Sequence, residues 1–206
     1  DLRWAATSVP TTLAVLWGDD LMARSAAGAR ARGVSVYEQM LGGTTAAEKR
    51  EALARAVARL TRDFGTWRTP WGEINRFQRL TGAPVQPNDD AKPSLPVPFT
   101  SALWGSLASI GQRAPRTTTR IYGDYGNSFV AAVEFGPRVR ARSVLAGGVS
   151  GDPASPHFAD QAALYAAGRF KDVAFHPDEV ARAAVRRYRP GGTSIEVRRT
   201  GGAGAR

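Results

Sequence analysis

Residues 123–161 read GDYGNSFVAAVEFGPRVRARSVLAGGVSGDPASPHFADQ, and this stretch holds the most regular pattern in the chain. In its SFVAAVEF segment successive side chains alternate, so that Phe129, Val133 and Phe135 share one face of an extended strand. The opposite face is mostly apolar as well. A strand that is apolar on both faces is typical of one that is covered on both sides.

A second strand follows at once. Gly136-Pro137 turns the chain, and residues 138–145 then place Val139 and Ala141 on one face, with the arginines between them on the other. This pattern predicts a half-exposed strand whose arginines point outward. Two strands joined by so short a turn form a hairpin, and the sequence therefore predicts an antiparallel sheet.

The best-marked helix starts at Thr45. Thr45 and Glu48 form a T-x-x-E capping box, in which the hydroxyl and the carboxylate each accept a free backbone N–H. We expect this helix to end at Gly65. The stripe expected to face the core is Leu53, Val57, Leu60 and Phe64.

Weaker signals predict the remaining elements. Alanine and arginine content favours a helix up to about Arg32, although residues 11–16 fit either a strand or a helix capped by Thr11 or Thr12. Five prolines in residues 83–98 predict a connecting loop without regular structure, in which Asn88, Asp89 and Asp90 form a solvated turn. Further predictions are a strand over residues 117–121, a helix over Phe158–Gly168, a strand over Phe170–Phe175 and a helix that starts at Pro177.

Composition limits the functional classes. The chain has 206 residues, 43% of them apolar, and no cysteine, which excludes a thiol nucleophile and any thiolate metal site. The net charge of +10 comes mostly from scattered arginines without a nucleic-acid-binding motif, so we expect no nucleic-acid partner. No apolar run approaches the roughly 20 residues that span a bilayer. Because residue 1 is Asp, we expect a processed chain or an excised piece.

Several polar residues are candidates for chemistry or for holding loops. His157 and Asp160 are three residues apart and resemble an acid–base pair, although a histidine here also suits a side chain that fixes a turn. In the aromatic stretch from Thr66 to Gly82, polar residues either hold a loop together or face a ligand. The candidate pocket or structural residues are Trp71, Asn75, Arg76, Asn127, Ser128, Asp152, His157 and Asp160.

Several motifs resemble one family. The strings LAVLWGDDL, TPWGEINRFQRLTG and GNSFVAAVEFG, followed by the stretch ending in DPASPHFADQ, occur in this order. Together they resemble the C-terminal part of the β-chain of penicillin-acylase-type enzymes, over roughly residues 10 to 190. The most specific part is G-x-S-G-D-P-x-S-P-H-x-x-D-Q, from Gly148 to Gln161.

The resemblance implies an N-terminal-nucleophile hydrolase with an αββα fold, an α+β class in which antiparallel sheets lie between helices. It implies hydrolysis of a linear amide by an N-terminal serine whose own amino group is the base. No cofactor is implied, and calcium occurs only in some members. None of the family's catalytic residues can be matched to a position in this chain, because residue 1 is Asp and the family's other catalytic groups lie earlier in the β-chain.

The expected organisation follows from that resemblance. Residues 1–200 are expected to be one incomplete domain, and residues 201–206 a disordered tail. The expected partners are the α-chain, the N-terminal part of the β-chain and a small acyl-amide substrate. The expected location is periplasmic or secreted. The alternative function is a scaffold or binding module that keeps the acylase fold without hydrolysis.

Overall fold

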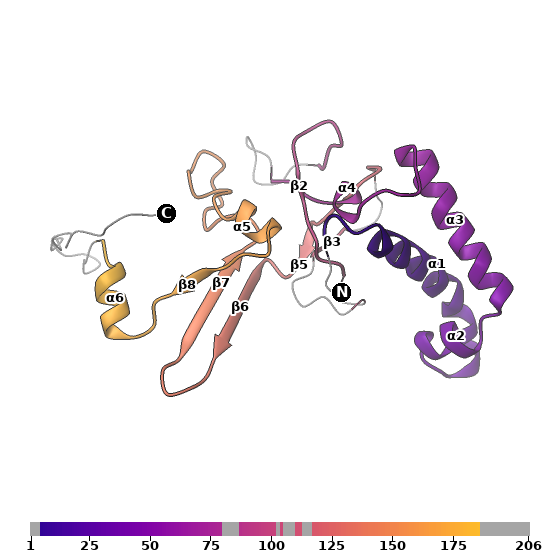
Figure 1. The fold of residues 1–206 in the computed structure, drawn as a ribbon, viewed down its shortest axis with the longest axis horizontal. Coiled ribbons are helices and arrows are strands. Elements are labelled where there is room, and N and C mark those ends of the chain that lie inside the picture. Colours follow the sequence, from indigo (N-terminus) through magenta and orange to yellow (C-terminus); the bar gives the residue numbers. More distant parts are fainter. Residues whose placement is uncertain (1–4, 80–86, 102–103, 105–109, 113–116, 186–206) are drawn as a thin grey trace. The chain divides into compact units, whose positions relative to one another are not determined.

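The structure, a computed structural model, describes residues 5–79, 87–101, 104, 110–112 and 117–185 (Figure 1). The chain divides into two compact units. Unit 1 comprises Asp1–Val130 with Val144–Arg169, and unit 2 comprises Ala131–Ser143 with Phe170–Arg206. Helices and small sheets occur together, so the predicted α+β class is confirmed.

Unit 1 begins with three helices, which are α1 (Val9–Arg32), α2 (Val36–Gly42) and α3 (Ala46–Phe64). The prediction of Thr11 or Thr12 as the first cap is wrong. Ser8 caps α1, because its side chain accepts a hydrogen bond from the backbone N–H of Thr11. Pro10 fits the first turn, where its missing N–H costs nothing. Gly33 ends the helix at a φ of 64°, a conformation that favours glycine.

The capping box at the start of α3 is confirmed, and so is its end at Gly65. The predicted core stripe is confirmed at Leu60, which is buried, and at Phe64, which packs against the core, but it is wrong at Leu53. Leu53 is 40% exposed, whereas Ala52 and Ala56 are buried together with Leu60. Small alanines at this spacing allow α3 to lie close against α1, which it contacts. The surrounding core consists of Val15, Leu16, Ala56, Leu60, Trp71, Ile74 and Ile121.

Two small sheets complete the centre of unit 1. The first has the order β2-β1-β4, with β1 (Asn75–Phe77) antiparallel to β2 (Leu95–Pro96) and parallel to β4 (Ile121–Tyr122). It follows α4 (Trp71–Ile74). The second pairs β3 (Ile110–Gly111) with β5 (Tyr125–Gly126). The proline-rich loop thus contributes a short strand, β2, contrary to prediction, because the partner strand β1 supplies its hydrogen bonds.

The predicted hairpin is confirmed as β6 (Phe129–Glu134) and β7 (Arg140–Leu145), which lie in the order β6-β7-β8 with β8 (Lys171–Val173). The strand β8 runs antiparallel to β7. The prediction that β6 is covered on both sides is wrong for this chain. Five of its six residues are exposed. An apolar pattern is visible in sequence, but the surface that would cover it is not supplied by the described residues.

Two short helices follow, α5 (Ala162–Ala166) and α6 (Pro177–Ala183). The predicted helix over Phe158–Gly168 is therefore too long at its start. Residues 158–161 form turns instead, because Gln161 is held by bonds to the end of β7. The predicted stop at Gly168 is confirmed by its φ of 64°. The expected tail at 201–206 lies outside the described residues. Within the described residues, no helix is long and apolar enough to cross a membrane.

Candidate functional site

The loop after β7 is closed by Gln161. Its side-chain oxygen accepts a hydrogen bond from the backbone N–H of Leu145 at 3.1 Å, and its own N–H donates to the carbonyl of Gly147 at 2.8 Å. Across the loop, Ser150 N–H donates to the carbonyl of His157 at 3.1 Å. The bonds of Gln161 join the end of the motif to the residues just before its start, and the bond from Ser150 to His157 crosses its middle. Gln161 is buried. The motif therefore forms a defined loop that is fastened to Leu145 and Gly147 at its start.

The acidic and imidazole groups of this loop contact one another or the backbone. His157 Nδ1 lies 2.9 Å from Asp160 Oδ2, so the predicted pair is in contact. The hydroxyl of Ser155 accepts the N–H of His157 at 3.2 Å, and a carboxylate oxygen of Asp152 accepts the N–H of Ala154 at 2.9 Å. The imidazole is 63% exposed. An imidazole in solvent, beside a serine that holds backbone, is suited to fixing a turn.

Gly148 marks the tightest point of the loop. A Cβ at this position would overlap the carbonyl of His157 and approach the carboxylate of Asp160. Glycine is required here because the backbone at residue 148 lies directly against the backbone of His157. The glycine and the histidine of the motif therefore belong to one packing arrangement.

Sequence reasoning missed Arg79. Its guanidinium donates to the carbonyl of Ser150 at 2.9 Å and lies 4.1 Å from the ring centre of Phe158. Phe158 is buried. Arg79 thus fastens the loop to the end of β1 through a hydrogen bond and a cation–π contact. No local signal could have found it, because the two partners are 71 residues apart.

The predicted candidates in the aromatic stretch hold backbone together. The side-chain amide of buried Asn75 donates to the carbonyls of Val97 and Phe99 at 3.0 and 2.6 Å. The indole N–H of buried Trp71 also donates to the carbonyl of Phe99, at 3.2 Å. This agrees with the interpretation that these polar groups fix a loop.

Arg76 also joins two backbone segments through its side chain. Its guanidinium donates to the carbonyl of Gly72 at 2.8 Å and to the carbonyl and hydroxyl of Ser94 at 2.7 and 3.0 Å. These three acceptors are neutral carbonyl or hydroxyl groups. The cation is therefore committed to joining α4 to the segment before β2.

A cavity of about 590 Å³ lies beside this region, within unit 1. Its walls include Phe77, Arg79, Asp124, Tyr125, Ser128 and Gly147. Of the two candidate pocket or structural residues here, Ser128 lines this cavity and Asn127 is not among its lining residues. Neither histidine of the chain lines it, so the hydroxyl of Ser128 has no imidazole base at this site.

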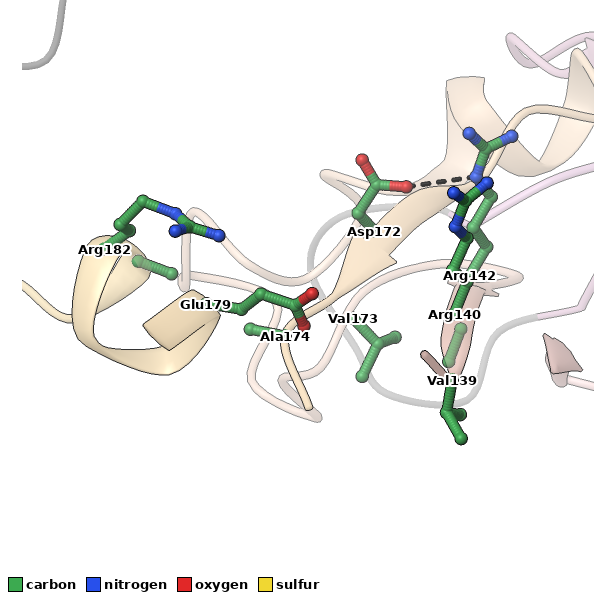
Figure 2. Close-up of a pocket in the computed structure, with 10 residues that line it drawn as sticks. Val139, Arg140, Arg142, Asp172, Val173, Ala174, Glu179 and Arg182 are labelled. Carbon is green, nitrogen blue, oxygen red and sulfur yellow. Dashed lines mark hydrogen bonds and ion pairs between the residues drawn. The ribbon is translucent and has the colours of Figure 1, made fainter. Parts of the chain in front are cut away.

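A second cavity, of about 620 Å³, lies within unit 2 between β7, β8 and α6 (Figure 2). Charged side chains dominate its rim. Arg142 pairs with Asp172 at 3.0 Å, and Arg182 pairs with Asp178 at 3.1 Å. These pairs are exposed to solvent, which weakens them. The arrangement is an open, mixed-charge surface and holds no nucleophile.

Two carboxyl groups at the start of α6 have lowered pKa values. Hydrogen bonds from the backbone N–H of Phe175, the guanidinium of Arg138 and the backbone N–H of His176 lower the pKa of Glu179 to about 2. Hydrogen bonding from Arg138 likewise lowers the pKa of Asp178. These acids fasten the start of α6 to the turn between β6 and β7, with Arg138 as the common donor.

The Asn88-Asp89-Asp90 turn is more than a solvated turn. A carboxylate oxygen of Asp90 accepts the N–H of Thr119 at 2.7 Å, and the other accepts the hydroxyl of Tyr122 at 3.0 Å. In the described part of the chain there is no group of three or more His, Asp or Glu residues that could hold a metal ion. Asp90 therefore holds β4 and the segment before it in place through hydrogen bonds to Thr119 and Tyr122.

Comparison with known proteins gives one family match. The family model described as penicillin amidase matches residues 1–182. Among curated proteins, none matches the chain significantly. The matched range includes the loop of Gly148–Gln161, the Asn75 region and the three N-terminal helices.

Proposed function

This chain belongs to the penicillin amidase family, and from that premise we propose that it is the C-terminal scaffold of an acylase β-chain whose reactive serine lies elsewhere in the enzyme. The family accounts for the α+β architecture, which is that of N-terminal-nucleophile hydrolases. Membership implies a parent enzyme that hydrolyses amide bonds. What we propose is the role of this chain in that enzyme, which is to support the site without supplying the nucleophile.

The use of the polar side chains in the family motif carries the proposal. Asn75, Arg76 and Gln161 donate or accept hydrogen bonds that join one backbone segment to another. His157 and Asp160 bond to one another at an exposed loop. Nucleophilic catalysis needs a nucleophile, a base within reach and a donor for the oxyanion. The described residues do not bring these three together, which supports a positioning role.

We extend the proposal to the substrate and the location. The substrate class is a linear N-acyl amide, such as an acyl-homoserine lactone or the side chain of a β-lactam, and the products are a carboxylic acid and an amine. Amide hydrolysis by a serine and its own amino group needs no cofactor. The enzyme is proposed to work in the periplasm or outside the cell. Family membership alone supports the proposed substrate class, cofactor independence and location.

An activity assay tests the proposal. The 206-residue chain is incubated with a chromogenic acyl amide, first alone and then after coexpression with the part of the acylase that precedes it. We expect turnover only in the second sample. Turnover by the chain alone would show that it contains the nucleophile. An assembled complex without turnover would favour the second candidate, a scaffold or binding module that does not hydrolyse amides.

A further inference from the structure

Arg79 is a half-buried cation without an acidic partner. Its guanidinium donates to the carbonyl of Ser150 at 2.9 Å, and no carboxylate of the described residues lies within ion-pair distance of it. A guanidinium has five N–H donors, so most of its capacity for hydrogen bonds is unused by these residues. Withdrawing a cation from water costs free energy unless an opposite charge or further acceptors compensate it. We therefore expect an anion as a further partner of Arg79.

The neighbours of Arg79 hold its guanidinium in one place. It lies 4.1 Å from the ring centre of buried Phe158, and a Cβ on Gly147 would overlap it. The cation therefore packs against an aromatic ring and against the backbone at residue 147, while the bond to Ser150 fixes its rotation. A group that is already in position loses little conformational entropy when it binds a ligand. Arg79 is thus a preorganised binding group.

The same side chain lines the cavity of about 590 Å³ in unit 1. This volume lies within the range of sites that bind small organic molecules. Phe77, Tyr125 and Leu145 contribute apolar surface to the walls, and Ser128 contributes a hydroxyl. The cavity therefore offers both a charged group and an apolar surface to a ligand.

The charge of the walls limits the kind of anion. Among the described residues that line the cavity, Arg79 and Asp124 are the charged ones, and no ion pair joins them. One cation and one carboxylate give the lining no net charge. A second negative charge on the ligand would meet the field of Asp124 without a second cation to offset it. The lining therefore favours a singly charged anion over a phosphate dianion.

We propose that this cavity binds a small organic monocarboxylate, with its carboxylate on the guanidinium of Arg79 and its apolar body against Phe77 and Tyr125. The planar fork of an arginine matches the two oxygens of a carboxylate. The binding site does not depend on amide hydrolysis, because none of these residues carries a catalytic role. It is therefore expected in the chain whether or not the parent enzyme is active.

Benzoate and benzamide are the probes, since they share a ring and differ in charge. Binding to the 206-residue chain at neutral pH is followed by NMR through the amide signals of Gly147 and Gly148, which line the cavity. We expect benzoate to shift these signals until they saturate. Benzamide should bind at least about 10-fold more weakly, because it cannot form the ion pair with Arg79. Inorganic phosphate should also bind at least about 10-fold more weakly than benzoate, because it lacks an apolar body and carries more charge.

Two arginine variants test the assigned cation. Arg79→Gln removes it, and Arg68→Gln is the matched control, because Arg68 also lies over an aromatic ring, that of Trp67 at 5.1 Å, but does not line the cavity. We expect Arg79→Gln to weaken benzoate binding about 10-fold or more and Arg68→Gln to leave it within about 2-fold. Arg79→Lys keeps the charge but not the fork, so its loss should lie between these values.

Three results would overturn the proposal. They are equal binding of benzoate and benzamide by the wild-type chain, no saturable shift at Gly147 and Gly148, and benzoate binding by Arg79→Gln equal to that of the wild type. Circular dichroism checks that each variant is folded. The comparison of benzoate with benzamide uses the wild-type chain, so it tests the proposal even if Arg79→Gln unfolds.

Discussion

The side-chain nitrogen of Asn75 lies 2.6 Å from the carbonyl oxygen of Phe99 and 3.0 Å from that of Val97. One buried amide therefore satisfies two carbonyls that lie 24 and 22 residues further along the chain. Its own backbone carbonyl accepts the N–H of Val97 at 3.0 Å. Asn75 thus continues the β1–β2 pairing with its side chain beyond the point where the strands separate.

Replacement of Asn75 by alanine should destabilise the chain by about 2 kcal/mol, because the carbonyl of Val97 loses its side-chain donor and the carbonyl of Phe99 keeps only the indole N–H of Trp71. Asn75→Asp should be worse, since a carboxylate would face the same carbonyls without hydrogens to donate. Urea unfolding followed by tryptophan fluorescence measures both. Asn88→Ala, which removes an amide from the nearby turn, is the control and should change stability by less than about 0.5 kcal/mol. Equal effects of Asn75→Ala and Asn88→Ala would contradict the role assigned to Asn75.

Two buried tyrosines should respond differently to removal of the hydroxyl. Tyr122 donates to Asp90 at 3.0 Å, so Tyr122→Phe should lower the free energy of unfolding by about 1 kcal/mol. The hydroxyl of Tyr165 has no hydrogen-bond partner in the described residues, and burial raises its pKa. Tyr165→Phe should therefore leave stability unchanged or raise it by about 1 kcal/mol. Urea unfolding measures the free energy of unfolding of both variants. If Tyr165→Phe lost as much stability as Tyr122→Phe, the hydroxyl of Tyr165 would have a hydrogen-bond partner.

Gly148→Ala should destabilise the chain by about 2 kcal/mol, because the added Cβ would overlap the carbonyl of His157 and force the loop apart. Gly151→Ala is a matched control in the same loop, since nothing lies within 4 Å of a Cβ there. It should change stability by less than about 0.5 kcal/mol. Thermal unfolding of the two variants measures the difference, and similar melting temperatures would count against the close packing of this loop.

Local chemistry explains which elements are predictable from sequence. The capping box at Thr45 and the turn at Gly136-Pro137 each need only neighbouring residues, and both are confirmed. The predicted face of α3 is confirmed at Leu60 and Phe64 but is wrong at Leu53, which is 40% exposed. The close approach of α1 selects Ala52 and Ala56 instead, which periodicity alone does not show.

The candidate site is less predictable, for the same physical reason. The sequence places His157 and Asp160 within reach of one another, and they are in contact. It contains no signal for Arg79, whose partner is 71 residues away, or for Asp90, which accepts a hydrogen bond from a residue 29 positions later. Contacts between distant segments depend on the fold, and no spacing rule encodes them.

Acidification should loosen the start of α6 through Glu179. Its pKa is lowered from the ordinary 4.5 to about 2, so its contribution to stability is complete above about pH 4.5 and is lost as the pH falls toward 2. The carbon-13 shift of its carboxyl group, followed by NMR during titration, measures this directly. In Arg138→Gln the pKa should rise only part of the way, because the N–H groups of Phe175 and His176 remain. A full return to 4.5 would show that the ion pair alone sets the shift.

His157→Ala tests whether the imidazole takes part in chemistry. The ring is mostly exposed and pairs with Asp160, so we expect stability to fall by less than about 1 kcal/mol. In the assembled acylase we expect the turnover rate to change less than about 2-fold, with the pH profile unchanged, because a general base would contribute about 100-fold or more. His157→Gln keeps a hydrogen-bond donor for Asp160 and should restore the lost stability. If turnover instead fell about 100-fold with a shifted pH profile, and glutamine did not rescue it, His157 would be a catalytic residue and its role as a turn-fixing side chain would be overturned.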